Sequence, residues 1–281
     1  MMSSRDQLLQ RERAASDAMA PKRARGMALG IIAALLPLGS FAQDKFEIQV
    51  YDSHIDPILV PRVELHLNYS PSGLRETSPE GELPTNHVAH YTLEPQTGLT
   101  DWCEVGGYFQ TALRPEGTFD FAGVKLRFKA RLPEQLWKVV GLALNTEVSY
   151  VPYGYEAQRW GSELRPIIDL RLGRFYAAIN PILSIEWTGP DAGIPQLEPA
   201  AKVSFDLFSG LALGSEYYAG LGPIDGLLPA REQTHALYAV LDWASSFLDL
   251  NLGVGYGGLG AGERWVAKAI VGVQWERPRG H

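Results

Sequence analysis

The chain has 281 residues, and its 25 Lys/Arg and 32 Asp/Glu give a formal net charge of −7. An acidic chain lacks the positive field that attracts a phosphate backbone, so the composition argues against nucleic acid as a partner. The single cysteine, Cys103, excludes an internal disulfide framework.

Residues 1–42 have the organisation of a secretory signal peptide. A basic stretch, 22–25, precedes the apolar run "MALGIIAALLPLGSFA", which ends in small residues suited to cleavage before Gln43. The run is shorter than the roughly 20 residues of a membrane-spanning helix. Removal of residues 1–42, which hold six Lys/Arg and three Asp/Glu, changes the formal net charge from −7 to −10. Translation from Met1 and translation from Met19 both remain open.

The rest of the chain alternates apolar and polar residues with a period of two, which predicts β-strands. Most of the segments have 9–14 residues, close to the length of a tilted strand that crosses a bilayer. A short strand-like segment, "FEIQVYD", precedes them within 43–59, which we expect to be a periplasmic lead-in. We predict a barrel over 60–275 and a short tail at 276–281. The predicted strands are 60–70, 87–95, 102–113, 119–131, 137–150, 162–172, 175–187, 200–208, 211–219, 235–243, 247–256 and 265–275.

The predicted connections alternate in length. Those after odd-numbered strands are mostly long, such as 71–86 and 220–234, whereas those after even-numbered strands are short, such as 173–174 and 209–210. Such sorting places long loops on one rim of a barrel and short turns on the other, as in outer-membrane barrels.

A ladder of cations on one face of 119–131 is the most unusual feature of the sequence. In "VKLRFKARL", the residues between the cations are apolar, which predicts hydrocarbon facing lipid and charge facing a wet lumen. A turn centred near residue 134 would place Arg127 opposite Gly141 and Lys125 opposite Ala143. The candidate solute-contacting cations of the lumen are Lys125, Arg127, Lys129, Arg131, Arg165 and Arg171, and their candidate acidic partners are Glu94, Glu104, Glu147 and Asp169.

Two interpretations of the ladder stay open. In one, Glu104 approaches Arg127 or Lys129 and Glu147 approaches Arg165, so that ion pairs brace the barrel. In the other, cations without a partner guide small anionic solutes. On the last predicted strand, Trp265 and Trp275 stand at the two ends of a row of small apolar residues. This spacing is typical of the aromatic girdles of a lipid-facing wall.

The segments "FEIQVYD" (46–52), "VELHLNY" (63–69), "FDFAGVKLRFK" (119–129) and "EYYAGLGP" (216–223) carry a family resemblance. They resemble an uncharacterised family of bacterial outer-membrane β-barrel proteins. The resemblance spans most of the chain after residue 42 and implies the barrel fold, but it brings no activity and no functional residues. The chain departs from the usual aromatic end of such barrels, because "ERPRGH" follows Trp275.

Catalytic and metal sites have little support in the sequence. His66 and Ser70 are four residues apart, or about 13 Å along a strand, too far for a hydrogen bond. A G-x-S-x-G motif is missing from the sequence. His87 and His90 are three apart, so on a strand they face opposite sides. We therefore expect no enzyme activity, no catalytic residue, no metal and no cofactor.

The sequence thus predicts one all-β domain, a transmembrane antiparallel up-and-down β-barrel of about 12 strands in the bacterial outer membrane. Its expected partners are outer-membrane lipid, the barrel-assembly machinery and small anionic solutes. The expected function is a narrow pore or small-solute transporter with a charged lumen. The alternatives are an outer-membrane lipid-acting enzyme and a soluble secreted barrel that binds a hydrophobic ligand.

Overall fold

The computed structural model describes residues 44–78, 81–132, 139–260 and 264–275. Within these residues, no helix is long and apolar enough to cross a membrane. The predicted signal peptide, 1–42, and the predicted tail, 276–281, lie outside the described residues. The strands are β1 (Arg62–Ser72), β2 (Ala89–Thr100), β3 (Cys103–Leu113), β4 (Phe119–Arg131), β5 (Val140–Tyr150), β6 (Trp160–Leu172), β7 (Phe175–Asn180), β8 (Leu183–Glu186), β9 (Gln196–Leu197), β10 (Ala200–Phe208), β11 (Leu211–Gly220), β12 (Gly222–Pro223), β13 (Thr234–Ala244), β14 (Leu248–Gly260) and β15 (Trp265–Gln274).

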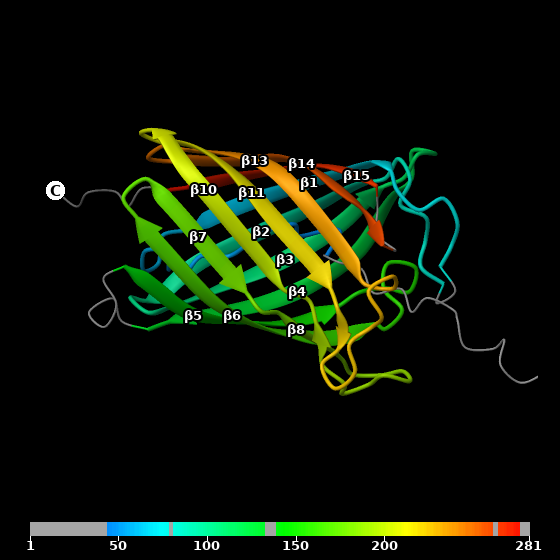
Figure 1. Cartoon of the computed structure of the whole chain (residues 1–281). Helices are drawn as coiled ribbons and strands as arrows, with labels where there is room; N and C mark the ends of the chain where they lie inside the picture. The colour runs from blue at the N-terminus through cyan, green and yellow to red at the C-terminus, as the bar shows by residue number, and fades with distance from the viewer. Residues whose placement is uncertain (1–43, 79–80, 133–138, 261–263, 276–281) are drawn as a thin grey trace, which may run out of the picture. The chain divides into compact units, whose positions relative to one another are not determined.

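These strands form one antiparallel sheet that closes on itself (Figure 1). β1 pairs with both β2 and β15, and the pairing of β6 with β7 completes the circle. Short breaks divide three strands of the wall: 181–182 separates β7 from β8, 198–199 separates β9 from β10, and Leu221 separates β11 from β12. The first two breaks contain Pro181 and Pro199, which have no N–H to donate to a ladder. With each divided strand counted once, the described residues form the predicted twelve-stranded up-and-down barrel.

The connections between strands define the two ends of the barrel. Because each strand of the wall lies beside its neighbour in sequence, successive connections alternate between the rims. The long-loop end carries 73–88, 151–159, 187–195 and 224–233, and the short-turn end carries 101–102, 173–174, 209–210 and 245–247.

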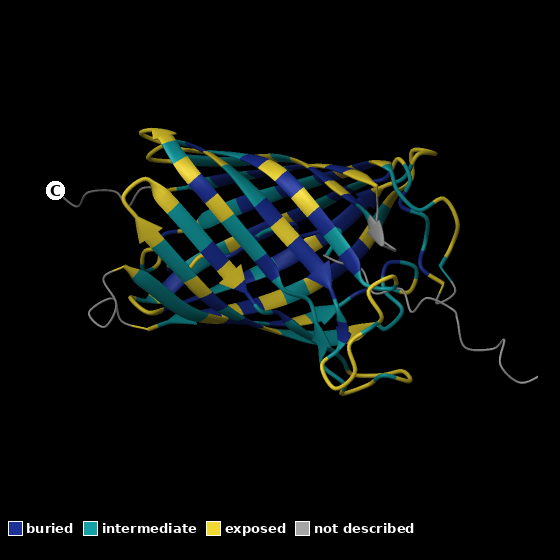
Figure 2. Cartoon of the chain, viewed as in Figure 1, coloured by how far each residue is buried: buried dark blue, intermediate teal, exposed yellow. Residues whose placement is uncertain are grey.

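Large apolar side chains cover the outside of the wall, and charged side chains face its interior. Along β4, Leu126 is 63% exposed and the next residue, Arg127, is 2% exposed. Figure 2 shows the same alternation of exposed and buried residues along β10, β11 and β13. Soluble sheets bury the apolar face and solvate the polar one. The inverted arrangement does not favour the alternative of a soluble barrel with inward apolar faces.

Exposed tryptophans border this apolar belt at both rims. Trp265 begins β15 and is 48% exposed, and Trp275 follows the strand and is 53% exposed. Tryptophan is enriched where a membrane meets water, because its ring is apolar and its N–H is polar. In the described residues, the exposed tryptophans are Trp160, Trp187 and Trp265 at the long-loop end and Trp102, Trp243 and Trp275 at the short-turn end.

Residues 44–60, which precede β1, run through the interior of the barrel. At the long-loop end, the Lys45 ammonium lies 3.0 Å from Glu82. At the other end, Thr97 donates a hydrogen bond of 3.2 Å to the carbonyl of Val60. The location differs from the predicted periplasmic lead-in. The reason is that the inward faces of the wall offer this segment both apolar surface and opposite charge. We call residues 44–60 the lumen segment.

A β-bulge at Gly123 turns the cation ladder of β4 inward. Gln110 of β3 lies opposite Gly123 and the next residue, Thr111, lies opposite Phe121, so that Ala122 is an extra residue of β4. Ala122 and Gly123 are both buried, and after them the odd-numbered cations face inward. Gly123 has φ 150°, and a Cβ there would lie 2.8 Å from the Gln110 side chain and 2.9 Å from the Tyr150 carbonyl. The position therefore requires glycine.

We expect Gly123→Ala to lower the free energy of unfolding by about 1–3 kcal/mol, because the new Cβ meets backbone and the φ angle is unfavourable. Thermal unfolding in detergent, followed by heat-dependent gel mobility, measures this loss. Gly107→Ala is the matched control, because its Cβ would have an ordinary contact of 3.5 Å with the Lys125 carbonyl. Equal midpoints for the two variants would contradict the assigned role of the bulge.

Candidate functional site in the barrel interior

Side chains of the wall bind the main chain of the lumen segment along its whole length. The Asn180 side-chain amide binds both main-chain groups of Tyr51: it accepts a hydrogen bond from the N–H at 2.7 Å and donates one to the carbonyl at 3.1 Å. Four other side chains of the wall donate to main-chain carbonyls of the segment: Asn68 to Lys45 (3.0 Å), Thr92 to Phe46 (2.9 Å), Lys268 to Ile48 (2.8 Å) and Arg165 to Gln49 (3.4 Å). Two carboxylates of the wall accept from its N–H groups: Asp169 from Ser53 (2.5 Å) and Glu104 from Asp56 (2.8 Å). The wall thus satisfies main-chain groups that would otherwise be buried without partners.

Three apolar side chains of the lumen segment pack against two different parts of the wall. Phe46 packs with Val88 and Tyr155 in an apolar cluster near the long loops. Ile48 and Val50 pack in a second apolar cluster with residues of β7, β10, β11 and β13. Both clusters are buried, so apolar contacts stabilise Phe46, Ile48 and Val50 inside the barrel.

Acidic side chains of the lumen segment contact the cations of the wall. The Glu47 carboxylate is 3.6 Å from Lys125 and 3.6 Å from Arg165. Lys125 also pairs with Asp44 and, at 3.4 Å, with Glu147. The Tyr51 hydroxyl hydrogen-bonds to Glu47. Lys125 of the cation ladder therefore forms ion pairs with the lumen segment of the same chain.

The middle of the ladder is neutralised by acids of β2 and β3. Arg127 lies 3.0 Å from Glu94 and 2.7 Å from Glu104, and Lys129 lies 3.0 Å from the same Glu104 oxygen. Arg127 and Lys129 also lie over the Tyr51 ring, 5.6 and 5.8 Å from its centroid. A buried guanidinium is stable only with such compensation.

Of the remaining predicted lumen residues, Arg131, Arg171 and Asp169 lie nearer the short-turn end and Arg165 lies near the middle of β6. Arg131 donates to the Asp101 carbonyl at 3.2 Å, and the exposed Arg171 pairs with Asp206 at 3.5 Å. Asp169 binds the lumen segment instead of a ladder cation. Arg165 pairs with Glu163 at 2.6 Å, and its guanidinium lies 4.2 Å from the centroid of the Tyr51 ring.

The predicted register of β4 and β5 is wrong. β5 begins at Val140, not at residue 137, so the connection after β4 is longer than the sequence suggests. Arg127 lies opposite Glu147 in place of Gly141, and Lys125 lies opposite Ser149 in place of Ala143.

A second charged cluster was missed by sequence reasoning. Lys268 of β15 is buried and pairs with Glu216, which is also 3.2 Å from Lys202. Lys202 in turn lies 2.8 Å from Asp242. A signal was present, because Lys268 is a lone cation between the small apolar residues of the last strand.

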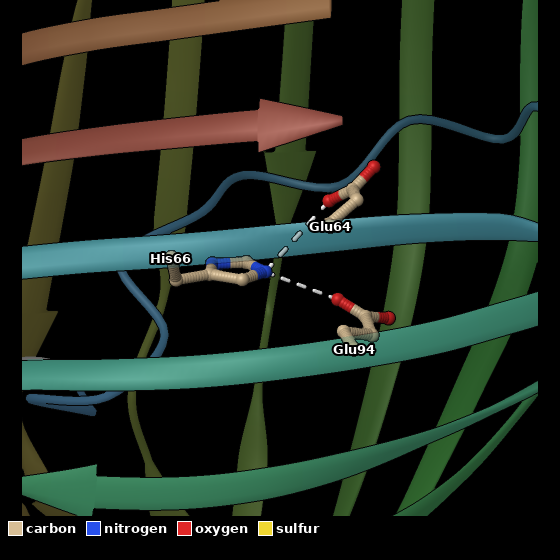
Figure 3. Close-up of side chains that lie close together, drawn as sticks. All are labelled: Glu64, His66 and Glu94. Carbon is tan, nitrogen blue, oxygen red and sulfur yellow. Dashed lines mark hydrogen bonds and ion pairs between the residues drawn. The ribbon is translucent and has the colours of Figure 1, made fainter. Parts of the chain in front are cut away.

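Glu64, His66 and Glu94 form a buried cluster whose side chains converge (Figure 3). The His66 Nε2 atom is 3.1 Å from Glu94 and 3.7 Å from Glu64. One histidine and two carboxylates are possible metal ligands. Both carboxylates, however, are already paired with guanidinium groups: Glu64 with Arg62 at 2.8 Å and Glu94 with Arg127 at 3.0 Å. Because Arg62 and Arg127 already neutralise the two carboxylates, the cluster fits a network of ion pairs better than a metal-binding site.

His87 and His90 do not converge. His90 is buried against Phe46, with ring centroids 4.7 Å apart. His87 instead lies 3.1 Å from the hydroxyl of Tyr69, which is exposed on the outer face.

A cavity of about 1080 Å³ opens at the short-turn end and reaches the lumen segment. Turn residues such as Gly210 and Ser245 line its mouth, and Tyr51 and Asp52 line its inner limit. Both acids and bases line its sides, including Arg171, Lys202, Asp206 and Asp242. Among the described residues, the cavity therefore extends from this end of the barrel to the lumen segment.

Comparison with solved structures identifies similar folds at very low sequence identity. The KdgM porin matches with a TM-score of 0.52 and 7% identity over 77% of this chain and 99% of its own. An outer membrane channel from Pseudomonas putida matches with a TM-score of 0.52 and 12% identity over 82% of this chain and 100% of its own. The NanC porin matches with a TM-score of 0.52 and 9% identity, over 76% and 100%. No protein-family model and no curated protein sequence matches the chain. The fold is thus that of outer-membrane β-barrels.

We expect Arg127→Gln to lower the free energy of unfolding by about 3–5 kcal/mol, because it leaves Glu94 and Glu104 buried without their guanidinium. Urea-induced unfolding in lipid vesicles, followed by tryptophan fluorescence, measures the change. Arg171→Gln serves as the control, since an exposed pair contributes less than about 1 kcal/mol. Similar losses in the two variants would show that the Arg127 network does not stabilise the interior.

Proposed function

We propose that the protein is a channel of the bacterial outer membrane for small solutes, and that its own lumen segment closes it. The observation that carries the proposal is the closed twelve-stranded barrel with an apolar outer belt and a charged interior. An apolar surface of this extent is stable against lipid and unstable in water. The porin folds among the similar structures support the same assignment.

The lumen segment makes this a channel with a closed state. Its apolar residues fill the long-loop half of the lumen, and the cavity of the short-turn half ends against it. Passage of a solute therefore requires that the lumen segment move or leave. Such a step turns a static pore into a gated one.

Opening would change the charge of the lumen as well as its width. The lumen segment contains four acids, Asp44, Glu47, Asp52 and Asp56, and one Lys/Arg residue, Lys45. Its departure removes a net charge of about −3 and separates Lys125 and Arg165 from Glu47. Rings of cations in a pore favour anions. The bracing and the anion-guiding interpretations of the ladder therefore apply to two states of one channel.

We expect Glu47→Lys to raise the open probability at least about ten-fold, because it places a third cation between Lys125 and Arg165. Planar-bilayer recording of the purified full chain measures the opening. The reversal potential between two chloride concentrations should show preference for the anion. Glu116→Lys is the matched control, with the same change of charge at an exposed turn of the long-loop end.

Two results would count against this function. A chain that gives no conductance as wild type or as Glu47→Lys is not a channel. Conductance that is equal in Glu47→Lys, Glu116→Lys and the wild type would mean that the lumen segment does not close the pore.

We expect the closed state to be more stable at pH 5 than at pH 7, because of Asp56. Burial and the nearby negative charge of Glu104 raise the pKa of Asp56 from 3.8 to about 6, although Arg62 and Lys129 oppose the shift. A carboxyl whose pKa is higher in the seated segment takes up a proton on seating. Closure is therefore favoured below pH 6, and this advantage is lost as the pH rises through 6.

The measurement is open probability between pH 5 and pH 7, with a rise of at most roughly ten-fold per pH unit. Burial raises the pKa of Glu47 as well, which acts in the same direction, whereas Lys125 lowers that of Asp44, which titrates below this range. Asp56→Asn should flatten the response. An unchanged pH response in that variant would exclude Asp56 as its source.

A further inference from the structure

We infer that the lumen is a binding site for an extended peptide, and that the lumen segment occupies this site as an internal mimic of the ligand. The inference rests on the proposed displacement of the lumen segment on opening. It adds the chemical class of the molecule that takes its place.

The wall binds main-chain groups along the whole lumen segment. Side chains of β1, β2, β3, β6, β7 and β15 bind its carbonyl and N–H groups from residue 45 to residue 60. These groups are common to every peptide. A pore for ions or for small non-peptide solutes needs no row of side chains matched to successive amides, whereas peptide-binding sites use main-chain hydrogen bonds in this way.

The lumen segment is held by side chains and is not part of the sheet. Among the described residues, one β-bridge joins it to the wall, between Ile58 and Gly98 at the short-turn end. From residue 45 to residue 56, its main-chain groups bind side-chain amides, hydroxyls, carboxylates, ammonium groups and guanidinium groups of the strands. Such contacts can be exchanged for those of another peptide without opening any ladder of the barrel.

The side-chain contacts define which peptide fits. Phe46, Ile48 and Val50 pack in two apolar clusters of the wall, and Glu47 pairs with Lys125 and Arg165. The Tyr51 ring lies beside three cations of the wall. The preferred ligand is therefore an extended peptide that alternates apolar residues with acidic or aromatic ones.

The test uses the full chain with a protease recognition sequence inserted between Ile58 and Leu59, where Leu59 is 67% exposed. Cleavage after folding leaves residues up to Ile58 in place without a covalent link. A synthetic peptide of residues 44–56, DKFEIQVYDSHID, with a fluorophore at its carboxyl end, is then added to the cleaved protein in detergent. We expect saturable binding by fluorescence anisotropy, with release of the resident segment. A scrambled peptide of the same composition should bind at least about ten-fold more weakly.

A second pair of measurements separates main-chain recognition from simple charge attraction. N-methylation of the Tyr51 amide of the peptide should weaken binding about three- to ten-fold, since it removes the donor that Asn180 reads. Asn180→Ala in the cleaved chain should weaken binding of the unmodified peptide by a similar factor. It should weaken binding of the methylated peptide by less. Glu116→Lys should change neither affinity.

The outcomes distinguish this inference from the channel itself. If the scrambled peptide binds as tightly as the native sequence, or if N-methylation has no effect, the inference is overturned while conductance of Glu47→Lys still supports a channel. If the native peptide exchanges but neither Glu47→Lys nor the wild type conducts, the peptide site stands and the channel function falls. If the resident segment stays bound against excess peptide and the peptide does not bind, the lumen segment is a permanent part of the barrel and the inference is overturned.

Discussion

A charge that faces a narrow lumen must have an opposite charge or a polar partner within a few ångströms, and this constraint shapes the whole interior. Removing a charge from water costs several kcal/mol unless it is compensated. The cations of β4 meet the requirement in two ways, through Glu94 of β2 and Glu104 of β3 and through Asp44 and Glu47 on the lumen segment. The ion pairs with Asp44 and Glu47 join the wall to the lumen segment, which is not a strand of the sheet.

The same constraint explains why the outer and inner faces of the wall differ so strongly. Each strand has one face against a surface that accepts only hydrocarbon and one face against a space that solvates charge. An inward leucine or an outward arginine would be unfavourable in the middle of a strand. The inward apolar residues include those that pack against Phe46, Ile48 and Val50, where the lumen segment replaces water.

Much of the fold follows from local patterns and could be predicted from the sequence. The alternation of apolar and polar residues is a property of each strand, so the strands of 119–131 and 211–219 were found to within one residue of the observed bounds. The inward direction of Arg127 and its approach to Glu104 follow from the same alternation. These features depend on residues within one hairpin.

Other features depend on contacts that no local pattern encodes. The register of β4 with β5 was missed because the length of the connection decides it, and residues 132–139 carry no strong turn signal. The interior position of residues 44–60 was missed because "FEIQVYD" alternates like any strand. Its partners, from Asn68 to Lys268, are spread over the whole chain. Pro181 signals the break between β7 and β8, but the alternating pattern continues across it.

The direction of the lumen segment has a consequence for the order in which the protein matures. Its residue 60 is joined to β1 at the short-turn end, while residues 44 and 45 reach the long loops. A tail that lies this way can enter a finished barrel only with its free amino end leading. Anything bulky attached to that end would have to pass through the lumen first. Removal of residues 1–42, the predicted signal peptide, would thus be a steric condition for seating the lumen segment in a closed barrel, in addition to a step of export.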